Sequence, residues 1–284
     1  MRKSARILAV YLICAAALQL AFGDFPVAAF AFPVNAAVLF AAAAGLWVLF
    51  REKPSCALSS WLISGNTSIL LLSALAVSCL VLGLVRQNPA GTESSHGFLG
   101  MRNIVRTWWF IAIVIALMAN LFMVIISRKT DLRFLLNHAG VLLALAGGFA
   151  GASDSSVMRA AVYRDKPSRE AFRMDGTPEV LEYELSMSAF TVEDDASGGV
   201  RNYMADVVVD DVETRIRVNH PYGRTLSEDI YLVSYDRSGG EPQYCVLEIV
   251  RQPWKYVMWT GIVMMMAGAV LLFARGVRKK EVMS

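Results

Sequence analysis

The chain has 284 residues, of which 56% are hydrophobic and 18% are charged. This composition, with a mean hydropathy of +0.47, indicates a polytopic membrane protein and excludes an ordinary soluble domain. The formal net charge of +3 hides an acidic segment, because residues 154–255 hold 19 of the 24 acidic residues and only 12 basic ones. A surface with a net charge of −7 excludes nucleic acid as an expected partner.

Six apolar stretches qualify, or nearly qualify, as membrane-spanning helices, which need about 20 residues each. In chain order they are residues 7–22, 27–50, 67–85, 107–127, 134–152 and 256–274. The first is short and follows Arg2 and Lys3, so a signal peptide cleaved near Gly23 is an alternative. A retained helix is favoured, because the next apolar stretch begins almost at once.

The basic residues beside these stretches predict their orientation, since cytoplasmic loops are enriched in Lys and Arg. A cytoplasmic N-terminus puts twelve basic residues inside, namely Arg2, Lys3, Arg6, Arg51, Lys53, Arg128, Lys129, Arg133, Arg275, Arg278, Lys279 and Lys280. Only three fall in the short outer segments, namely Arg86, Arg102 and Arg106. We therefore expect a protein of the cytoplasmic (inner) membrane with both termini in the cytoplasm and the acidic segment outside.

Four regions are predicted along the chain. Residues 1–63 form an N-terminal extension of two membrane helices, and residues 64–153 hold helices three to five with one short outer loop that contains His96. Residues 154–254 form a β-rich extracytoplasmic (periplasmic) domain, inserted between the fifth and sixth helices. Residues 255–284 form the last helix and a basic cytoplasmic tail.

Alternating apolar residues predict five strands in the outer domain. They lie at residues 181–187, 203–209, 214–218, 230–235 and 244–250. The polar stretch at residues 160–178 is expected to have little regular structure. Five strands at this spacing favour a small antiparallel sandwich or an open barrel. Cys245 falls in an apolar run and is expected to be a buried strand residue.

The fourth helix begins with Trp108 and Trp109, which is typical of an interfacial aromatic belt. Contact with a flat apolar ligand is the alternative for this pair. Asn120 lies well inside the same helix, where an amide more often joins helices than binds a ligand.

The fifth helix holds the one intramembrane histidine, His138, about 7–8 Å along the axis from Arg133. An ionisable side chain in a bilayer is costly, so a functional role is the default hypothesis. A lone imidazole cannot build a full metal site, but it can be an axial ligand of haem, whose porphyrin supplies four nitrogens. A hydrogen bond that packs helices is an equal alternative. Farther along the helix, Gly147 and Gly151 have the GxxxG spacing that permits close helix packing.

The acidic segment shows no zinc-ligand spacing, glycine-rich phosphate loop or catalytic triad pattern. Its one histidine, His220, precedes Pro221, which predicts a turn at a strand end and favours a structural role.

From about Ser64 onward, some three-quarters of the chain resembles the ResB (CcsB) family of cytochrome c biogenesis proteins. The resemblance rests on an ordered set of segments: Gly83 to Gln87, Val105-Arg106-Thr107-Trp108-Trp109-Phe110, His138-Ala139-Gly140, Ile216-Arg217-Val218-Asn219-His220-Pro221-Tyr222, Ile230-Tyr231-Leu232-Val233-Ser234-Tyr235 and Gln252-Pro253-Trp254. Two features depart from the family pattern: the first two helices are additional, and the outer domain is short.

The resemblance implies a non-catalytic subunit of the system II cytochrome c synthase (haem lyase), which exports haem and attaches it to the CxxCH thiols of apocytochrome c. Haem b would be bound in transit, with His138 as an axial ligand. Trp108, Trp109, Asn120 and His220 are candidate contacts with haem or with a partner. The partners would be a tryptophan-rich membrane protein of the ResC (CcsA) type, apocytochrome c, membrane lipid and, indirectly, thiol-reducing proteins.

Two other functions remain open from the residues alone. One is a small proton-coupled permease in which His138 relays protons, although other intramembrane charges are scarce. The other is a membrane-anchored scaffold or sensor whose outer domain binds a partner, with His138 only packing helices.

Overall fold

A computed structural model of the chain describes residues 1–88, 98–128, 131–164, 166–194, 200–238 and 240–274. The residues outside this description include His96, Lys129 and the basic residues of the tail. The chain forms two compact units. Among the described residues, those within 1–88, 98–153 and 254–274 form the helical unit, and those within 154–253 form the sheet unit.

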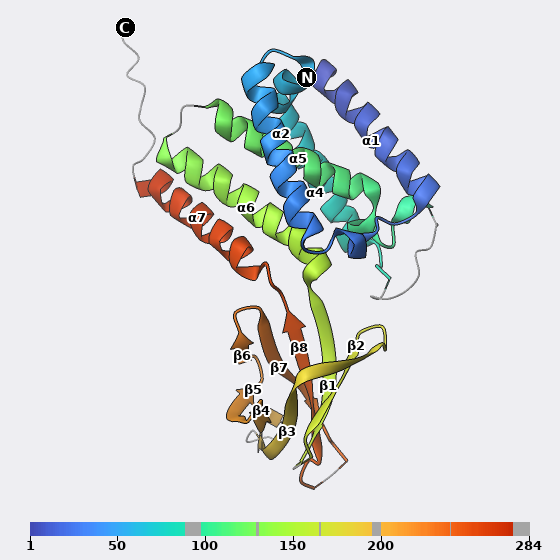
Figure 1. The fold of residues 1–284 in the computed structure, drawn as a ribbon, viewed down its shortest axis with the longest axis vertical. Helices are drawn as coiled ribbons and strands as arrows, with labels where there is room; N and C mark the ends of the chain where they lie inside the picture. The colour runs from blue at the N-terminus through green and yellow to red at the C-terminus, as the bar shows by residue number, and fades with distance from the viewer. Residues whose placement is uncertain (89–97, 129–130, 165, 195–199, 239, 275–284) are drawn as a thin grey trace. The chain divides into compact units, whose positions relative to one another are not determined.

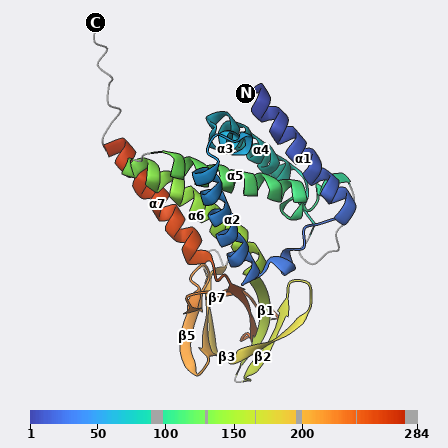
Figure 2. The same ribbon diagram turned by 45° about the horizontal axis from the view of Figure 1, so that its top comes forward.

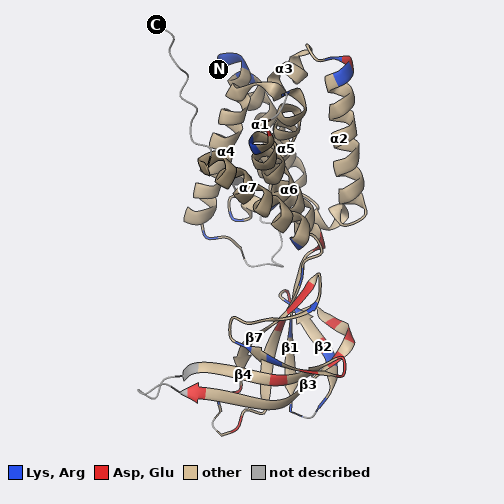
Figure 3. Ribbon diagram, turned by 90° about the vertical axis from the view of Figure 1, so that its left-hand side faces the viewer, with Lys and Arg blue, Asp and Glu red and all other residues tan. Residues whose placement is uncertain are grey.

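The helical unit contains seven α-helices within the described residues (Figures 1 and 2). They are α1 (Arg2–Phe22), α2 (Val34–Glu52), α3 (Ala57–Ile63), α4 (Gly65–Leu84), α5 (Trp108–Ser127), α6 (Leu132–Asp154) and α7 (Lys255–Ala274). Three short 3₁₀ turns, η1 (Val27–Phe30), η2 (Phe98–Gly100) and η3 (Ile104–Arg106), lie in the connections. All but α3 are long and apolar enough to cross a membrane, so the six predicted apolar helices are confirmed. Figure 3 shows their charged residues gathered near helix ends.

Helix α5 lies at the centre of the helical unit and is the most buried of its long helices. Thr107 caps its N-terminus, because the hydroxyl accepts a bond from the Phe110 amide and donates one of 2.7 Å to the Ile104 carbonyl. Tyr11 of α1 donates to the carbonyl of Ala112 at 3.1 Å, so the additional first helix is joined directly to α5. A fully buried amide, Asn35, joins α2 to the carbonyl of Ala150 in α6 at 3.1 Å.

Helices α6 and α7 pack through a seam of glycines. A Cβ atom added to Gly140 would lie 2.6 Å from the carbonyl oxygen of Gly261, and one added to Gly261 would lie 2.5 Å from atoms of α6. Gly147 is as tightly placed, since its Cβ would lie 2.8 Å from the Met258 amide nitrogen. The close packing predicted from the GxxxG spacing is therefore confirmed, with α7 as the neighbour.

The glycine seam predicts that Gly140→Ala and Gly261→Ala each destabilise the helical unit by about 1–3 kcal/mol, the usual cost of overpacking. Gly148→Ala is the matched control, because a Cβ there meets nothing within 4 Å. Thermal unfolding of the purified protein, followed by tryptophan fluorescence, measures the difference. Equal melting temperatures for Gly140→Ala and Gly148→Ala would contradict the packing.

The sheet unit contains eight described strands. They are β1 (Ser156–Tyr163), β2 (Ser168–Arg173), β3 (Pro178–Asp194), β4 (Val200–Val209), β5 (Val212–Arg217), β6 (Tyr222–Thr225), β7 (Glu228–Tyr235) and β8 (Tyr244–Arg251). Each pairs antiparallel with its neighbours, in the order β5-β4-β3-β2-β1-β8-β7-β6. The five predicted strands are confirmed as β3, β4, β5, β7 and β8, although Val218 lies one residue beyond the end of β5.

One expectation for the sheet unit is wrong. Residues 160–178 contain half of β1 and all of β2, and the many polar side chains of β2 hid its strand pattern. Of the two architectures that the sequence left open, the two-sheet sandwich is excluded, because one continuous sheet contains all eight described strands. The sheet curls, since the hydroxyl of Tyr203 in β4 donates to the carbonyl of Val233 in β7 at 3.2 Å although four strands separate β4 from β7. The alternative of an open barrel therefore describes the arrangement.

One face of the curled sheet forms its core. Cys245 is fully buried there, as predicted, and burial raises the pKa of its thiol to about 12. Between β4 and β5, Asp210 and Asp211 both have positive φ (54° and 64°). That is the conformation of a two-residue hairpin turn, and short acidic side chains tolerate it.

The buried carboxylate of Glu228, at the start of β7, joins this strand to β3, β6 and β8. Glu228 is 2% exposed and accepts hydrogen bonds from Tyr183, Arg224 and Arg251 at 2.8, 2.5 and 2.5 Å. Burial alone would raise the pKa of Glu228, but the bonds from Arg251, Arg224 and Tyr183 outweigh burial and hold the pKa below its ordinary value. The network therefore stabilises the sheet when Glu228 is ionised.

Glu228→Gln should destabilise the sheet unit by up to about 3–5 kcal/mol, the cost of breaking a buried ion pair. Because the pKa of Glu228 is lowered on folding, the difference should be full at neutral pH and shrink as the pH falls below the ordinary value of 4.5. Hydrogen exchange of peptides from β3, β7 and β8, corrected for intrinsic rates, measures it. Glu184→Gln, which breaks an exposed pair with Arg169, is the control. A difference that grew with acidity would contradict this account.

Candidate functional site

His138 is the seventh residue of α6, and a local hydrogen bond fixes the position of one ring proton. Its Nδ1 lies 2.9 Å from the carbonyl oxygen of Phe134, one turn earlier. A carbonyl only accepts, so Nδ1 carries the proton and a neutral ring keeps a lone pair on Nε2. Nε2 makes no hydrogen bond to any residue that the structure describes. This arrangement is typical of a metal-ligating histidine, whose other nitrogen donates to a carbonyl.

Aromatic packing fixes the orientation of the imidazole. The rings of His138 and Phe134 are stacked, with centroids 3.8 Å apart and planes at 24°. On the same Phe134 ring lies the guanidinium of Arg128, 5.3 Å from its centroid. Three side chains from the end of α5 and the start of α6 therefore form a compact group.

His138 lines a pocket of about 480 Å³, here called the His138 pocket. This volume is within the roughly 300–1,000 Å³ of small-molecule sites, and most of the lining is apolar, as is usual for such sites. The lining comes from the end of α3 and from α4, α5 and α6, with Arg128 after α5: Ile63, Gly65, Ser68, Ile69, Leu72, Leu117, Asn120, Leu121, Val124, Arg128, Asn137, His138 and Val141. The pocket brings together two residues singled out from sequence, His138 and Asn120.

Asn120 is 1% exposed and joins three helices. Its Nδ2 donates to the carbonyl of Leu62 in α3 at 2.5 Å, and its Oδ1 accepts from Ser68 of α4 at 2.9 Å. The prediction that this amide joins helices is confirmed. Its bonds hold the wall of the His138 pocket in place.

Asn120→Ala should destabilise the helical unit by about 0.6–1.7 kcal/mol, the range for hydrogen bonds between membrane helices. Ser127→Ala is the control on the same helix, because that hydroxyl bonds only the nearby carbonyl of Val124. Denaturant unfolding in mixed micelles would compare the variants. A control as destabilised as Asn120→Ala would show that the bonds to α3 and α4 contribute nothing.

Three polar residues of the His138 pocket had not been singled out from sequence: Ser68, Arg128 and Asn137. Asn137 precedes His138, and its amide donates to the Arg133 carbonyl at 2.9 Å and packs against Gly268 of α7. Arg128 had entered only the charge count for orientation. The sequence signal that could have identified Arg128 is its position at the end of one span, directly before the span that contains His138.

Trp108 and Trp109 lie elsewhere. They begin α5, about 18 Å along its axis from Asn120, and they do not line the His138 pocket. The indole of Trp109 donates to the Leu99 carbonyl at 2.9 Å, and the ring of Trp108 packs edge-on against Phe25 at 5.0 Å. The buried Nε1 of Trp108 has no hydrogen-bond partner among the described residues.

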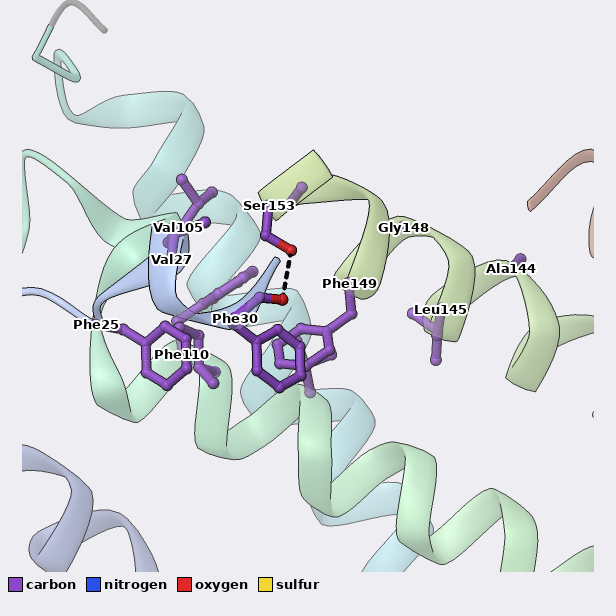
Figure 4. Close-up of a pocket in the computed structure, with 13 residues that line it drawn as sticks. Phe25, Val27, Phe30, Val105, Phe110, Ala144, Leu145, Gly148, Phe149 and Ser153 are labelled. Carbon is purple, nitrogen blue, oxygen red and sulfur yellow. Dashed lines mark hydrogen bonds between the residues drawn. The ribbon is translucent and has the colours of Figure 1, made fainter. Parts of the chain in front are cut away.

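A second cavity of about 310 Å³ lies between η1, α5 and α6, where Phe25, Phe30, Phe110 and Phe149 gather (Figure 4). Ser153, the one hydroxyl-bearing residue in its lining, donates to the Phe30 carbonyl at 2.9 Å. No titratable side chain lines this cavity. It therefore offers no ligand for a metal, in contrast to the His138 pocket.

His220 belongs to the sheet unit, where it is exposed between β5 and β6. Its amide donates to the Arg217 carbonyl at 3.0 Å, and Asn219 before it has a φ of 61°. The predicted turn is confirmed. A role for His220 in binding remains a prediction.

Within the described parts of the chain, no group of three or more His, Cys, Asp or Glu side chains could hold a metal ion. The single imidazole of the His138 pocket therefore fits a metal that brings most of its own ligands. A metalloporphyrin is such a group, because it needs only axial ligands from protein.

Comparisons with known proteins bear on this site. Residues 130–241, which include His138, match the family model described as the ResB-like family. No curated protein matches the chain. Among solved structures it is similar to a chain named Cytochrome c Heme Lyase CcmF, with 16% identity and a TM-score of 0.38 over 84% of this chain. The aligned part spans only 38% of that structure, and a similarity at this level carries no information about chemistry.

Proposed function

We propose that the chain, whose residues 130–241 match the model of the ResB-like family, is the haem-binding membrane subunit of a cytochrome c synthase. In this role it binds haem b in transit and presents it for attachment to the CxxCH thiols of apocytochrome c. The observation that supports the proposal is the Nε2 of His138, which bonds no described residue while the bond from Nδ1 to the Phe134 carbonyl holds the ring in place.

His138 would bind the haem iron through Nε2, as one axial ligand. The Nδ1 bond would fix the tautomer and the ring orientation and raise the basicity of Nε2 as a ligand. Stacking against Phe134 limits rotation of the ring. The apolar walls from Ile69, Leu72, Leu117 and Leu121 would cover the porphyrin and exclude water from the iron.

The proposed topology suits this task. We place the six apolar helices across the inner membrane, with both termini in the cytoplasm and the sheet unit outside, inserted between the fifth and sixth spans. His138 follows the cytoplasmic Arg133 by about 7–8 Å along α6. The His138 pocket then lies in the inner half of the membrane, where it would receive haem made in the cytoplasm.

Completion of the reaction falls to partners in this proposal. The subunit would bind and present haem, and it would not itself catalyse the attachment. A tryptophan-rich membrane protein of the ResC (CcsA) type would supply the second axial ligand. The region of Trp108 and Trp109 and the sheet unit, with His220, would face this partner or apocytochrome c.

The test uses the chain purified together with its ResC-like partner. His138→Ala should lower the Soret absorbance of the complex severalfold, and added imidazole should restore it, because the free ligand replaces the missing side chain. His96→Ala is the matched control, because it removes a histidine that has no assigned role in the proposal, and it should keep the full spectrum. A Soret band of normal intensity and position in His138→Ala would contradict the proposed function.

A further inference from the structure

Arg128 follows the last turn of α5 and lines the His138 pocket. Its guanidinium lies over Phe134, whose other contact is the stacked ring of His138. A permanent positive charge is therefore held at the same aromatic side chain that orients the proposed iron ligand. The ring of Phe134 therefore positions both the guanidinium of Arg128 and the imidazole of His138.

The charge of Arg128 has no counterpart within the described part of the chain. No described carboxylate forms an ion pair with it, and the described lining of the His138 pocket contains no Asp or Glu. The nearby Arg133 differs, because it pairs with Asp131. A guanidinium beside an apolar pocket at a membrane surface gains strongly from an anion that can enter with the ligand.

We propose that Arg128 binds a carboxylate of the ligand in the His138 pocket. The pocket would then select a ligand that has a metal at its centre, an apolar body and a negatively charged edge. Under the proposed function, on which this inference rests, the carboxylate is a haem propionate. Arg128 is exposed, so the propionate edge would lie at the pocket mouth. The apolar edge of the porphyrin would then point toward Leu117 and Leu72.

The type of side chain fits this role. A guanidinium presents two parallel N–H donors, which match both oxygens of a carboxylate, whereas an ammonium acts as a point charge. The alternative is that Arg128 extends toward lipid phosphates, as long basic side chains often do near helix ends. That alternative predicts no preference among porphyrins.

The experiment compares iron protoporphyrin IX with its dimethyl ester, which has the same iron and ring but no carboxylate charge. The complex of the chain with its partner is titrated with each, in the wild type and in Arg128→Gln, Arg128→Lys and Arg133→Gln. We expect the wild type to prefer the free acid on the order of tenfold or more, as for a charge-assisted hydrogen bond. Arg128→Gln should lose this preference without changing the affinity for the ester.

The two other variants serve as controls. Arg128→Lys keeps the charge and should retain part of the preference, and Arg133→Gln should retain all of it. A full preference in Arg128→Gln, or an equal loss in Arg133→Gln, would overturn the inference. If the spectrum still depends on His138 in that case, the proposed function survives. Failure of the wild type to bind either porphyrin would overturn both.

Discussion

The bond from the Nδ1 of His138 to the carbonyl of Phe134 is the interaction on which the site depends. It uses a carbonyl of the histidine's own helix, so it needs no partner from another helix. One ring nitrogen is occupied by the fold and the other is left for a ligand. A bond to a neighbouring helix would have made the imidazole a packing residue, which was the equal alternative from sequence.

The rest of the helical unit holds this imidazole in place. The glycine seam brings the backbones of α6 and α7 into contact, so α6 has little freedom to shift. On the other side, Asn120 joins α5 to α3 and α4 through two hydrogen bonds. The glycine seam uses small residues and the Asn120 contact uses an amide. Inside a lipid bilayer the hydrophobic effect does not drive helices together, so close packing and interhelical hydrogen bonds take its place. The His138 pocket lies between these two rigid contacts.

Sequence predicted much of the fold, and the misses have physical causes. Long apolar stretches are unambiguous, so the spans were found. In the sheet unit, β2 buries only Ala171 fully, which left no alternation to read. His138 was singled out as a candidate because a titratable residue in a span is costly. Arg128 was not, since a basic residue at a span end already has an explanation in topology, and its stacking on Phe134 depends on the turn between two helices.

The most direct measurement of the central claim is electron–nuclear double resonance of ferric haem in the complex, with only this chain labelled with ¹⁵N-histidine. The chain has three histidines, so an assignment by substitution is practical. The account predicts one strong ¹⁵N coupling that disappears in His138→Ala and persists in His96→Ala and His220→Ala. A complex that holds haem without any such coupling, or one whose coupling survives in His138→Ala, would contradict it.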